Sequence, residues 1–425
     1  MKLLQNWVKY YYIFIAAQGQ TIKSSKMTQS SSYQGWNITE AEREIYRKRS
    51  QASSQAKAKA LRGEGLPPIH PINQPKLNPA TLMPKLAPNG LNSLSLFSGG
   101  GGLDLGFEYA GFNHIAAYEI IPDAGITLKQ NRQDWQVFSG EDGDVTKIDW
   151  RPYHGLVDVL HGGPPCQPFS VAGRQKGQAD SRDMFPEFVR AILEIEPKAF
   201  VAENVTALVG KKFQRYVEEV IERPLNQKYH LTKFILSAPD FGIPQIRKRV
   251  FFVGFRDEKI AATYQPPQPT HSWQELSAND ADKPIQLNLL SHENFAKNRC
   301  MGVREALGLP DIGFDGLAPT IRSGLTGPRH TTSILSSVSA QKVWEKLQIW
   351  PNGVAATREK AHLFVAKNGH FRLSVADCAI VQGFPESWSI YGAVYMALGQ
   401  IGNAVPPPMA YWVAVSVAEA LLSSD

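Results

Sequence analysis

The chain has 425 residues, of which 43% are hydrophobic and 20% charged, so it is not a disordered protein and can form two or three globular domains. The net charge of +6 is compatible with a polyanionic partner but does not require one. Its three cysteines, Cys166, Cys300 and Cys378, are too widely spaced for a disulfide framework or a zinc cluster. A reducing compartment and no metal site are therefore expected.

The amino-terminal part differs in composition from the rest. Residues 10–17 are apolar but too short to span a bilayer, and we expect neither export nor a membrane. Met27 opens a polar segment, so translation from Met27 instead of Met1 is an open alternative. The pattern of residues 37–63 predicts a helix whose basic run, Arg47 to Arg49, is more often a solvated face than a phosphate contact.

A proline-rich linker, residues 66–89, precedes a region in which short apolar segments alternate with helical ones. The segments expected to be strands are residues 93–97, 114–118, 156–160, 199–202 and 250–254. This alternation predicts an α/β fold with a doubly wound, mainly parallel sheet. From about residue 258 the chain is polar and irregular, which predicts a smaller second domain built largely from loops. Order returns at residue 371, and residues 409–422 are expected to form an apolar helix.

A glycine-rich loop follows the first expected strand. Residues 97–102, Phe-Ser-Gly-Gly-Gly-Gly, lie between this strand and a helical segment, so the backbone can approach a ligand closely. Glu119 and Asp144 come at later strand ends, where they can accept hydrogen bonds from a nucleoside. The loop would also suit a dinucleotide-binding oxidoreductase. Glu119 can alternatively be a surface charge, and Asp144 a helix cap.

Cys166 is the strongest candidate for a nucleophile. It follows Pro164 and Pro165, which fix the backbone and remove donors, and so disfavour a central strand at this point. The cysteine is therefore expected just beyond the carboxyl end of a strand, where open α/β sheets bind ligands. A thiol there can attack an electron-poor ring carbon, although a buried structural cysteine is the alternative on composition alone.

Five motifs, in this order, resemble those of cytosine-5 DNA methyltransferases. They are Phe-x-Gly-x-Gly-Gly at 97–102, Pro-Cys-Gln at 165–167, Glu-Asn-Val at 203–205, Gln-Ile-Arg-Lys-Arg at 245–249 and Gly-Asn-Ala-Val at 402–405. The resemblance covers residues 94–420 apart from a variable stretch. It implies a Rossmann-like methyltransferase fold, S-adenosylmethionine as cofactor, and methylation of a cytosine flipped out of double-stranded DNA.

The resemblance also assigns roles to residues. Cys166 would add to carbon-6 of cytosine and Glu203 would contact ring nitrogen-3 and the amino group. Arg247 would position the base or its phosphate, and Arg249 would pair with nearby carboxylates. The implied cofactor pocket comprises Phe97, Gly99, Gly101, Gly102, Leu103, Glu119, Ile120, Asp144, Val145, Pro165, Asn403 and Ala404. The implied DNA contacts are Gln167, Ser170, Arg174 and Lys176 in a loop that closes over DNA, and Arg322 and Arg329 in the variable region.

On this resemblance the chain divides into four parts. They are an extension and linker (1–91), a catalytic and cofactor-binding domain (92–257), a target-recognition domain (258–370) and a return to the catalytic domain (371–425). Two positions depart from the family pattern: Ser95 replaces a common aspartate, and Ala376-Asp377 stands where Arg-Glu is frequent, which leaves a specific ion pair in doubt.

Three other functions stay open. A transfer-RNA methyltransferase of the same fold would carry the same motifs, and a silent DNA-binding regulator would not need Cys166 and Glu203. A nicotinamide-dependent oxidoreductase would leave the cysteine and the paired arginines unused. The expected enzyme is a cytoplasmic, nucleoid-associated monomer, compatible with a restriction-modification system in which a cognate endonuclease acts separately.

Overall fold

The computed structural model describes residues 40–165, 183–274, 298–323, 331–366 and 368–423. Two compact units are present, Met1–Glu44 and Ile45–Asp425, and the described elements lie in the second apart from the start of helix α2 (Glu40–Leu61). Helix α2 extends into this unit and lies where the sequence predicted a helix.

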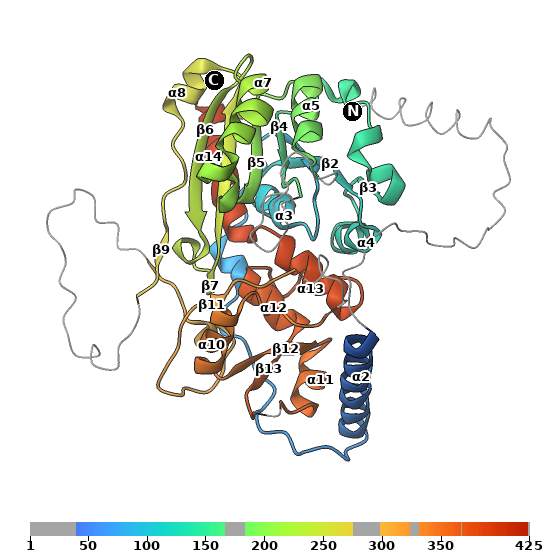
Figure 1. Ribbon diagram of the computed structural model, residues 1–425. Helices are drawn as coiled ribbons and strands as arrows, with labels where there is room; N and C mark the ends of the chain where they lie inside the picture. Colours follow the sequence, from blue (N-terminus) through green and yellow to red (C-terminus); the bar gives the residue numbers. More distant parts are fainter. Residues whose placement is uncertain (1–39, 166–182, 275–297, 324–330, 367, 424–425) are drawn as a thin grey trace, which may run out of the picture. The chain divides into compact units, whose positions relative to one another are not determined.

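The central element is a seven-stranded sheet with the strand order β3-β2-β1-β4-β5-β8-β6 (Figure 1). Its strands are β1 (Asn92–Leu96), β2 (Asn113–Glu119), β3 (Val137–Ser139), β4 (Val159–Gly162), β5 (Ala199–Val205), β6 (His230–Ser237) and β8 (Lys248–Phe255). Neighbouring strands are parallel except that β8 runs antiparallel to both β5 and β6. The predicted mainly parallel α/β sheet is confirmed, whereas β3 and β6 were not predicted.

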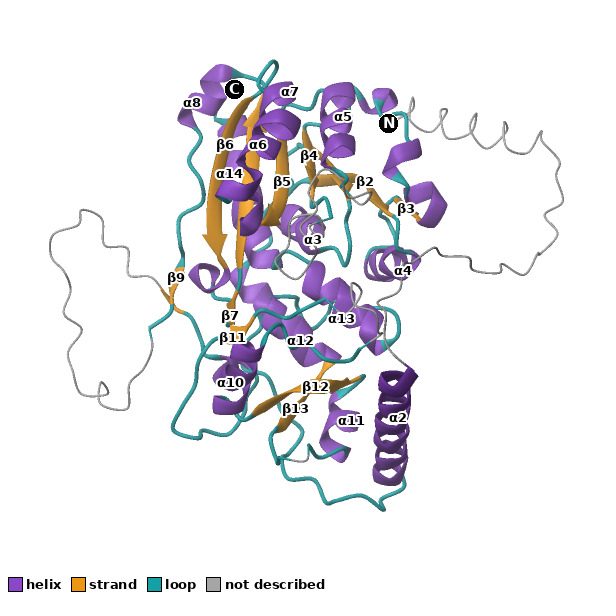
Figure 2. Ribbon diagram, in the orientation of Figure 1, coloured by secondary structure: helices purple, strands orange, loops and turns teal. Residues whose placement is uncertain are grey.

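Successive strand residues face opposite layers, as the two-residue period of a strand requires. Val159 of β4 packs in the core cluster that includes helices α3 (Gly102–Tyr109) and α14 (Pro407–Leu422). Leu160 packs in the cluster on the other side, with helix α5 (Phe185–Ile195), and Figure 2 shows helices flanking the sheet. Helices therefore cover both faces of the sheet, as in a doubly wound fold.

Helix α14 follows the predicted apolar segment and lies close to α3. A Cβ at Gly106 of α3 would lie only 2.5 Å from the Ala410 Cβ, so glycine permits this approach. By length and composition alone, Val394–Leu422 can cross a membrane, but 83% of its most apolar window is buried inside the protein. Since core helices pass the same test, this stretch is weak evidence for a membrane span.

The remaining helices are short. They are α4 (Pro122–Asn131), α6 (Gln214–Tyr216), α7 (Arg223–Leu225), α8 (Glu258–Thr263), α9 (Val303–Ala306), α10 (Val338–Lys346), α11 (Arg358–Leu363), α12 (Val375–Gln382) and α13 (Val394–Asn403). The described residues also form three strand pairs: β9 (His271–Ser272) with β10 (Asn298–Arg299), β7 (Gln245–Ile246) with β11 (Ala318–Pro319), and β12 (Ile349–Ala355) with β13 (Phe371–Ser374). Short 3-10 turns and a π-helix, Val217–Glu222, lie between these elements.

The described parts of residues 258–370 consist of these short elements and loops. Their core is not separate from that of the sheet, since Trp344 and Ile349 belong to the same hydrophobic cluster as Phe251 of β8. The domain boundaries taken from the sequence therefore stay a prediction.

Candidate active site

Glu203 of β5 and Arg249 of β8 lie diagonally across these antiparallel strands, since Arg249 is opposite Val205 in the register. The Arg249 Nε lies 2.7 Å from Glu203 Oε1, and Glu203 is only 6% exposed. Within the described residues Oε1 has no partner with hydrogen-bond geometry, so charge attraction dominates this contact. Burial raises the pKa of Glu203 above its usual value, and the charges of Arg249 and Arg247 oppose the rise. A carboxyl group whose pKa is raised by burial and lowered by neighbouring positive charges can both hold and release a proton.

The chain leading to Cys166 runs beside this carboxyl group. Asn204 Nδ2 donates to the carbonyl of Pro164 at 3.0 Å, and a Cβ at Gly163 would lie 3.0 Å from Glu203 Oε2. Cys166 itself lies outside the described residues, as do Gln167, Ser170, Arg174 and Lys176. No role was predicted for Asn204, although it lies inside the Glu-Asn-Val motif.

Arg247 has a partner that the sequence did not suggest. It is 1% exposed, and its Nη2 donates to the carbonyls of Gly402 at 2.9 Å and Ala404 at 2.7 Å. These carbonyls flank Asn403, a predicted cofactor residue. In the structure, Arg247 therefore fixes the backbone between α13 and α14 through these hydrogen bonds. A contact of Arg247 with the base or its phosphate stays a prediction.

Glu119 fixes the glycine loop from the end of β2. Its Oε2 accepts from the Gly99 amide at 2.7 Å and its Oε1 from the Ile121 amide at 2.8 Å. Burial raises the pKa of Glu119, and the two amides counteract this shift. At Gly99, with φ of 54°, the Phe97 carbonyl, at 4.0 Å, is the one atom of the described residues that a Cβ would meet. As far as the described residues go, one side of the loop at Gly99 has room for a ligand.

The residues around this opening suit a nucleoside. Ile120, 54% exposed, follows Glu119 at the carboxyl end of β2 and offers an apolar surface. Asp144 Oδ1 accepts from the Thr146 amide at 3.1 Å, so the helix cap considered from the sequence is present, and its side chain keeps 23% exposure. An apolar surface together with carboxylate acceptors can hold an aromatic ring and the polar groups attached to it.

The predicted cofactor residues fall into an accessible group and a supporting group. The accessible ones are Phe97, Gly99, Ile120, Asp144, Pro165 and Asn403, and the buried ones are Gly101, Gly102, Leu103, Glu119, Val145 and Ala404. Among the buried residues, position 102 requires glycine, because a Cβ there would lie 2.2 Å from the Val405 carbonyl. In the described ranges no group of three His, Cys, Asp or Glu side chains is arranged to hold a metal ion.

A buried amide network reaches this site from the variable region. Gln245 Nε2 donates to Gln382 Oε1 at 2.9 Å, and Gln382 Nε2 donates to the Ala404 carbonyl at 2.6 Å. Gln245 Oε1 in turn accepts from the Ile321 amide at 3.3 Å. The exposed Arg322 follows at once, so this predicted DNA contact lies near the candidate site. Arg329 lies outside the described residues.

Trp388 is a further residue that sequence reasoning missed. Its Nε1 donates to the Gly100 carbonyl at 3.0 Å, and a Cβ at Gly101 would lie 2.7 Å from its ring. The Arg132 guanidinium lies 5.2 Å from the centre of the same ring. No sequence motif marks this residue, which lies 288 positions from its partner.

Comparisons with known proteins identify the family of the chain. The family model described as C-5 cytosine-specific DNA methylase matches residues 91–419. The chain is 34% identical over 330 residues to the Type II methyltransferase M.NgoMIV of Neisseria gonorrhoeae, covering 77% of this chain and 97% of that protein. It is 30% identical over 352 residues to M.FnuDI of Fusobacterium nucleatum, covering 78% and 95%.

The matched family and relatives are methyltransferases. The chain belongs to the C-5 cytosine-specific DNA methylase family, and it is a DNA (cytosine-5-)-methyltransferase. Among solved structures, the S. pombe Dnmt2 methyltransferase matches with a TM-score of 0.48 and 16% identity over 79% of this chain and 99% of that chain, which is too low to support an argument.

Proposed function

We propose that this enzyme methylates carbon-5 of a cytosine in a specific duplex DNA site through a covalent adduct with Cys166, with S-adenosylmethionine as methyl donor. One observation carries the proposal: the chain that leads to Cys166 runs so close to the buried Glu203 carboxyl group that a Cβ at Gly163 would lie 3.0 Å from Glu203 Oε2. This contact supports a site in which nucleophile and proton donor act on the same base.

The proposed reaction starts at carbon-6. The Cys166 thiolate adds there, and the ring electrons displaced toward nitrogen-3 are neutralised by a proton from Glu203. Carbon-5 thereby becomes nucleophilic and takes the methyl group. Loss of the carbon-5 proton to a solvent base then re-forms the double bond and expels the thiolate, while nitrogen-3 returns its proton. Arg249 keeps the Glu203 carboxyl group oriented through these steps.

The cofactor is assigned to the glycine loop. Gly99 and Phe97 would contact it through the backbone, Ile120 would support the adenine, and Glu119, Asp144 and Asn403 would provide polar contacts. When bound, S-adenosylmethionine supplies an electrophilic methyl group on a positively charged sulfur. Arg247 contributes by holding the carbonyls on either side of Asn403.

The DNA contacts are assigned to the loop after Cys166 and to the variable region. A cytosine inside a duplex is out of reach of a thiol, so it is flipped out at a cost of about a few kcal/mol. Gln167, Ser170, Arg174 and Lys176 would contact the opened duplex, and Arg322 and Arg329 would read or anchor it. We place the enzyme in the cytoplasm as a monomer, in a restriction-modification system whose endonuclease is a separate protein.

Bisulfite sequencing of DNA from cells that express the protein tests this function. We expect resistant cytosines at one recurring sequence, and none in cells expressing Cys166→Ala. In parallel, duplex DNA and transfer RNA are offered to the purified enzyme with labelled cofactor. Label on RNA alone, or methylated cytosine made by Cys166→Ala, would overturn the proposal.

A further inference from the structure

A segment on the amino-terminal side of the family match, residues 91–419, is hydrogen-bonded to the predicted target-recognition domain. We call residues 66–91 the strap. The amides of Lys76 and Leu77 both donate to the Ala306 carbonyl at the end of α9, at 3.0 and 3.1 Å. A Cβ at Gly308 would lie 1.9 Å from the Gln74 carbonyl, so the strap passes very close to this turn. These contacts fix the first half of the strap on the predicted recognition domain.

The second half of the strap is fixed on the catalytic domain. The Leu86 amide donates to the Tyr109 carbonyl at 2.8 Å, and the Asn89 amide donates to the Gly111 carbonyl at 2.9 Å. Tyr109 is the last residue of helix α3, which the glycine loop opens, and Gly111 lies two residues beyond its end. Met83 is fully buried in the core. The strap therefore joins two parts of the enzyme that the sequence separates by about two hundred residues.

Asn73 lies where the strap meets α12. Its Nδ2 donates to the Leu307 carbonyl at 3.1 Å and to Asp377 Oδ1 at 3.0 Å. Asp377 is fully buried, and the same oxygen accepts from Arg358 Nε at 2.9 Å. Its other oxygen accepts from the Ser374 amide and hydroxyl at 2.8 and 2.6 Å and caps α12. Asp377 thus forms an ion pair with Arg358, although Ala376, the residue before it, stands where arginine is frequent in the family.

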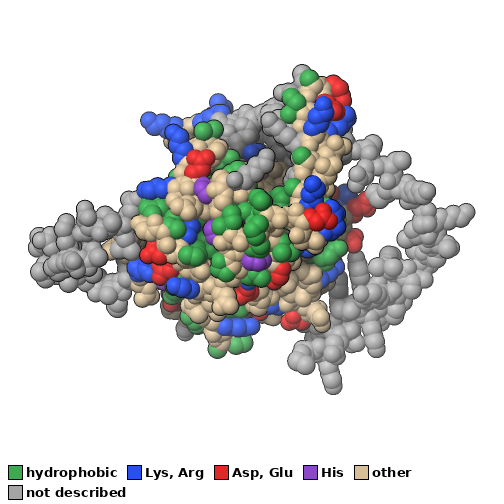
Figure 3. Space-filling model, turned by 90° about the horizontal axis from the view of Figure 1, so that it is seen from below, with side chains coloured by type: hydrophobic (Ala, Val, Ile, Leu, Met, Phe, Trp, Pro, Cys, Tyr) green, Lys and Arg blue, Asp and Glu red, His purple; other side chains and the backbone are tan. Residues whose placement is uncertain are grey.

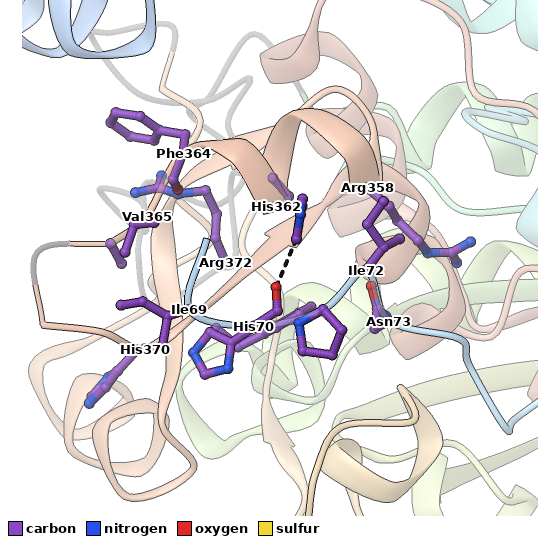
Figure 4. Close-up of a pocket in the computed structure, with 14 residues that line it drawn as sticks. Ile69, His70, Ile72, Asn73, Arg358, His362, Phe364, Val365, His370 and Arg372 are labelled. Atoms are coloured by element: carbon purple, nitrogen blue, oxygen red, sulfur yellow. Dashed lines mark hydrogen bonds between the residues drawn. The ribbon is translucent and has the colours of Figure 1, made fainter. Parts of the chain in front are cut away.

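Further contacts hold the strap next to Asn73. His362 Nδ1 donates to the His70 carbonyl at 2.7 Å (Figure 4). His70 Nε2 in turn donates to the Gly369 carbonyl at 2.7 Å. Seen from below, hydrophobic and histidine side chains lie between Lys and Arg on this face of the molecule (Figure 3). The strap is packed against the recognition domain here, which limits how freely Asn73 can move.

Helix α12 connects Asn73 with the predicted DNA reader. Asp377 lies in the first turn of this eight-residue helix, and Gln382 is its last residue. Gln382 bonds Gln245, which accepts from the Ile321 amide beside the exposed Arg322. A shift of the first turn of so short a helix moves its last turn as well, because the helix is a rigid unit.

We propose that Asn73 is a positioning residue for sequence recognition: by bonding Leu307 and Asp377 together, it sets the position of α12 and hence of the Ile321-Arg322 segment relative to the catalytic site. This inference rests on the proposed function, because it assumes that the segment reads DNA. The strap accordingly contributes to sequence recognition by this methyltransferase through Asn73.

The test compares Asn73→Ala with Asn78→Ala in the full-length enzyme. Asn78 is an exposed strap residue whose side chain caps a short helical turn through the Ala80 amide, so its loss affects stability without touching Asp377. The measurements are KM and kcat for duplex DNA, methylation of a panel of single-mismatch sites, binding of S-adenosylhomocysteine by calorimetry, and Tm. Asn73→Ala should raise KM for DNA about tenfold and relax mismatch discrimination, equivalent to about 1.4 kcal/mol, with cofactor-product binding within twofold of wild type.

Asn78→Ala should lower Tm at most and leave KM and site preference as in wild type. If Asn73→Ala changes only Tm, Asn73 is structural and the inference is wrong. If Asn73→Ala does not fold, Gly308→Ala serves as the second variant, because its Cβ displaces the strap at Gln74. We expect Gly308→Ala to lose mismatch discrimination as well. Unchanged discrimination in that variant would also overturn the inference. A wild-type enzyme that methylates no DNA would instead refute the proposed function.

Discussion

Arg249 Nε lies 2.7 Å from Glu203 Oε1 on the neighbouring antiparallel strand, and both side chains are largely buried. Burial raises the pKa of Glu203 and the arginine charge opposes the rise. If protonated Glu203 is the active form, kcat falls as pH rises through this pKa. Arg249→Leu removes the opposing charge, so we expect the pKa to rise further and the alkaline limb of the kcat profile to move to higher pH.

The maximum rate of Arg249→Leu should also fall, because the carboxyl group loses the partner that orients it. Glu203→Gln, which cannot exchange a proton in this range, should lower kcat by about 10²- to 10⁴-fold. The control is Arg256→Leu, since Arg256 lies 3.8 Å from Glu196 at an exposed site away from Glu203. A profile of Arg249→Leu that coincides with wild type would exclude Glu203 as the titrating acid.

Trp388 supports the glycine loop through its indole N–H. Trp388→Phe retains an aromatic ring but loses the donor to the Gly100 carbonyl, and a lost hydrogen bond of this kind costs about 1 kcal/mol. We expect the Kd for S-adenosylhomocysteine to rise about fivefold, with kcat at saturating cofactor within a factor of two of wild type. Calorimetry without DNA measures this directly.

The matched control for Trp388 is Trp412→Phe. In the described part of the chain the Trp412 Nε1 has no hydrogen-bond partner, so the same substitution removes an indole without removing a bond. Equal effects of the two variants would show that ring volume, and not the contact with Gly100, supports the loop.

His161 should make stability depend on pH. It is fully buried in β4, stacks on Phe107 with ring centres 4.1 Å apart, and burial lowers its pKa to about 4. Between pH 6.5 and 4 the unfolded chain binds a proton at this position and the folded chain does not. The free energy of unfolding should therefore fall by about 3 kcal/mol as pH drops through this range, and the contribution is fully present above pH 6.5.

Urea unfolding at several pH values measures this slope. His161→Leu, an apolar replacement at a position without hydrogen bonds among the described residues, should flatten it. His230→Leu, at an exposed position on β6, is the control. An unchanged slope in His161→Leu would assign the pH dependence to other groups.

Much of the catalytic frame follows from local sequence. The β-branched runs around Val159 and Val253 predicted strands because they are buried on both faces, and the glycine loop and Glu119 were placed at strand ends by the same reasoning. Strand β6 was missed because it lies at the sheet edge, where residues such as His230 and Lys233 are polar. The antiparallel direction of β8 depends on connections that a short pattern does not encode.

The contacts that join distant segments could not be predicted. Asn73 and Asp377 are 304 residues apart, and the ion pair of Asp377 with Arg358 depends on how α11 packs beside α12. Arg247 illustrates a different limit, since its motif indicated a functional arginine but could not show that carbonyls of Gly402 and Ala404 are its partners.

Covalent trapping tests the central claim most directly. Duplex DNA with 5-fluorocytosine at the target position is incubated with the enzyme and S-adenosylmethionine. Fluorine on carbon-5 cannot leave as a proton does, so the thiolate is not expelled. We predict a denaturant-resistant complex whose peptide map places the DNA on Cys166, and no such complex with Cys166→Ala. An adduct that persists in Cys166→Ala, or its absence in an enzyme that methylates unmodified cytosine, would contradict the account.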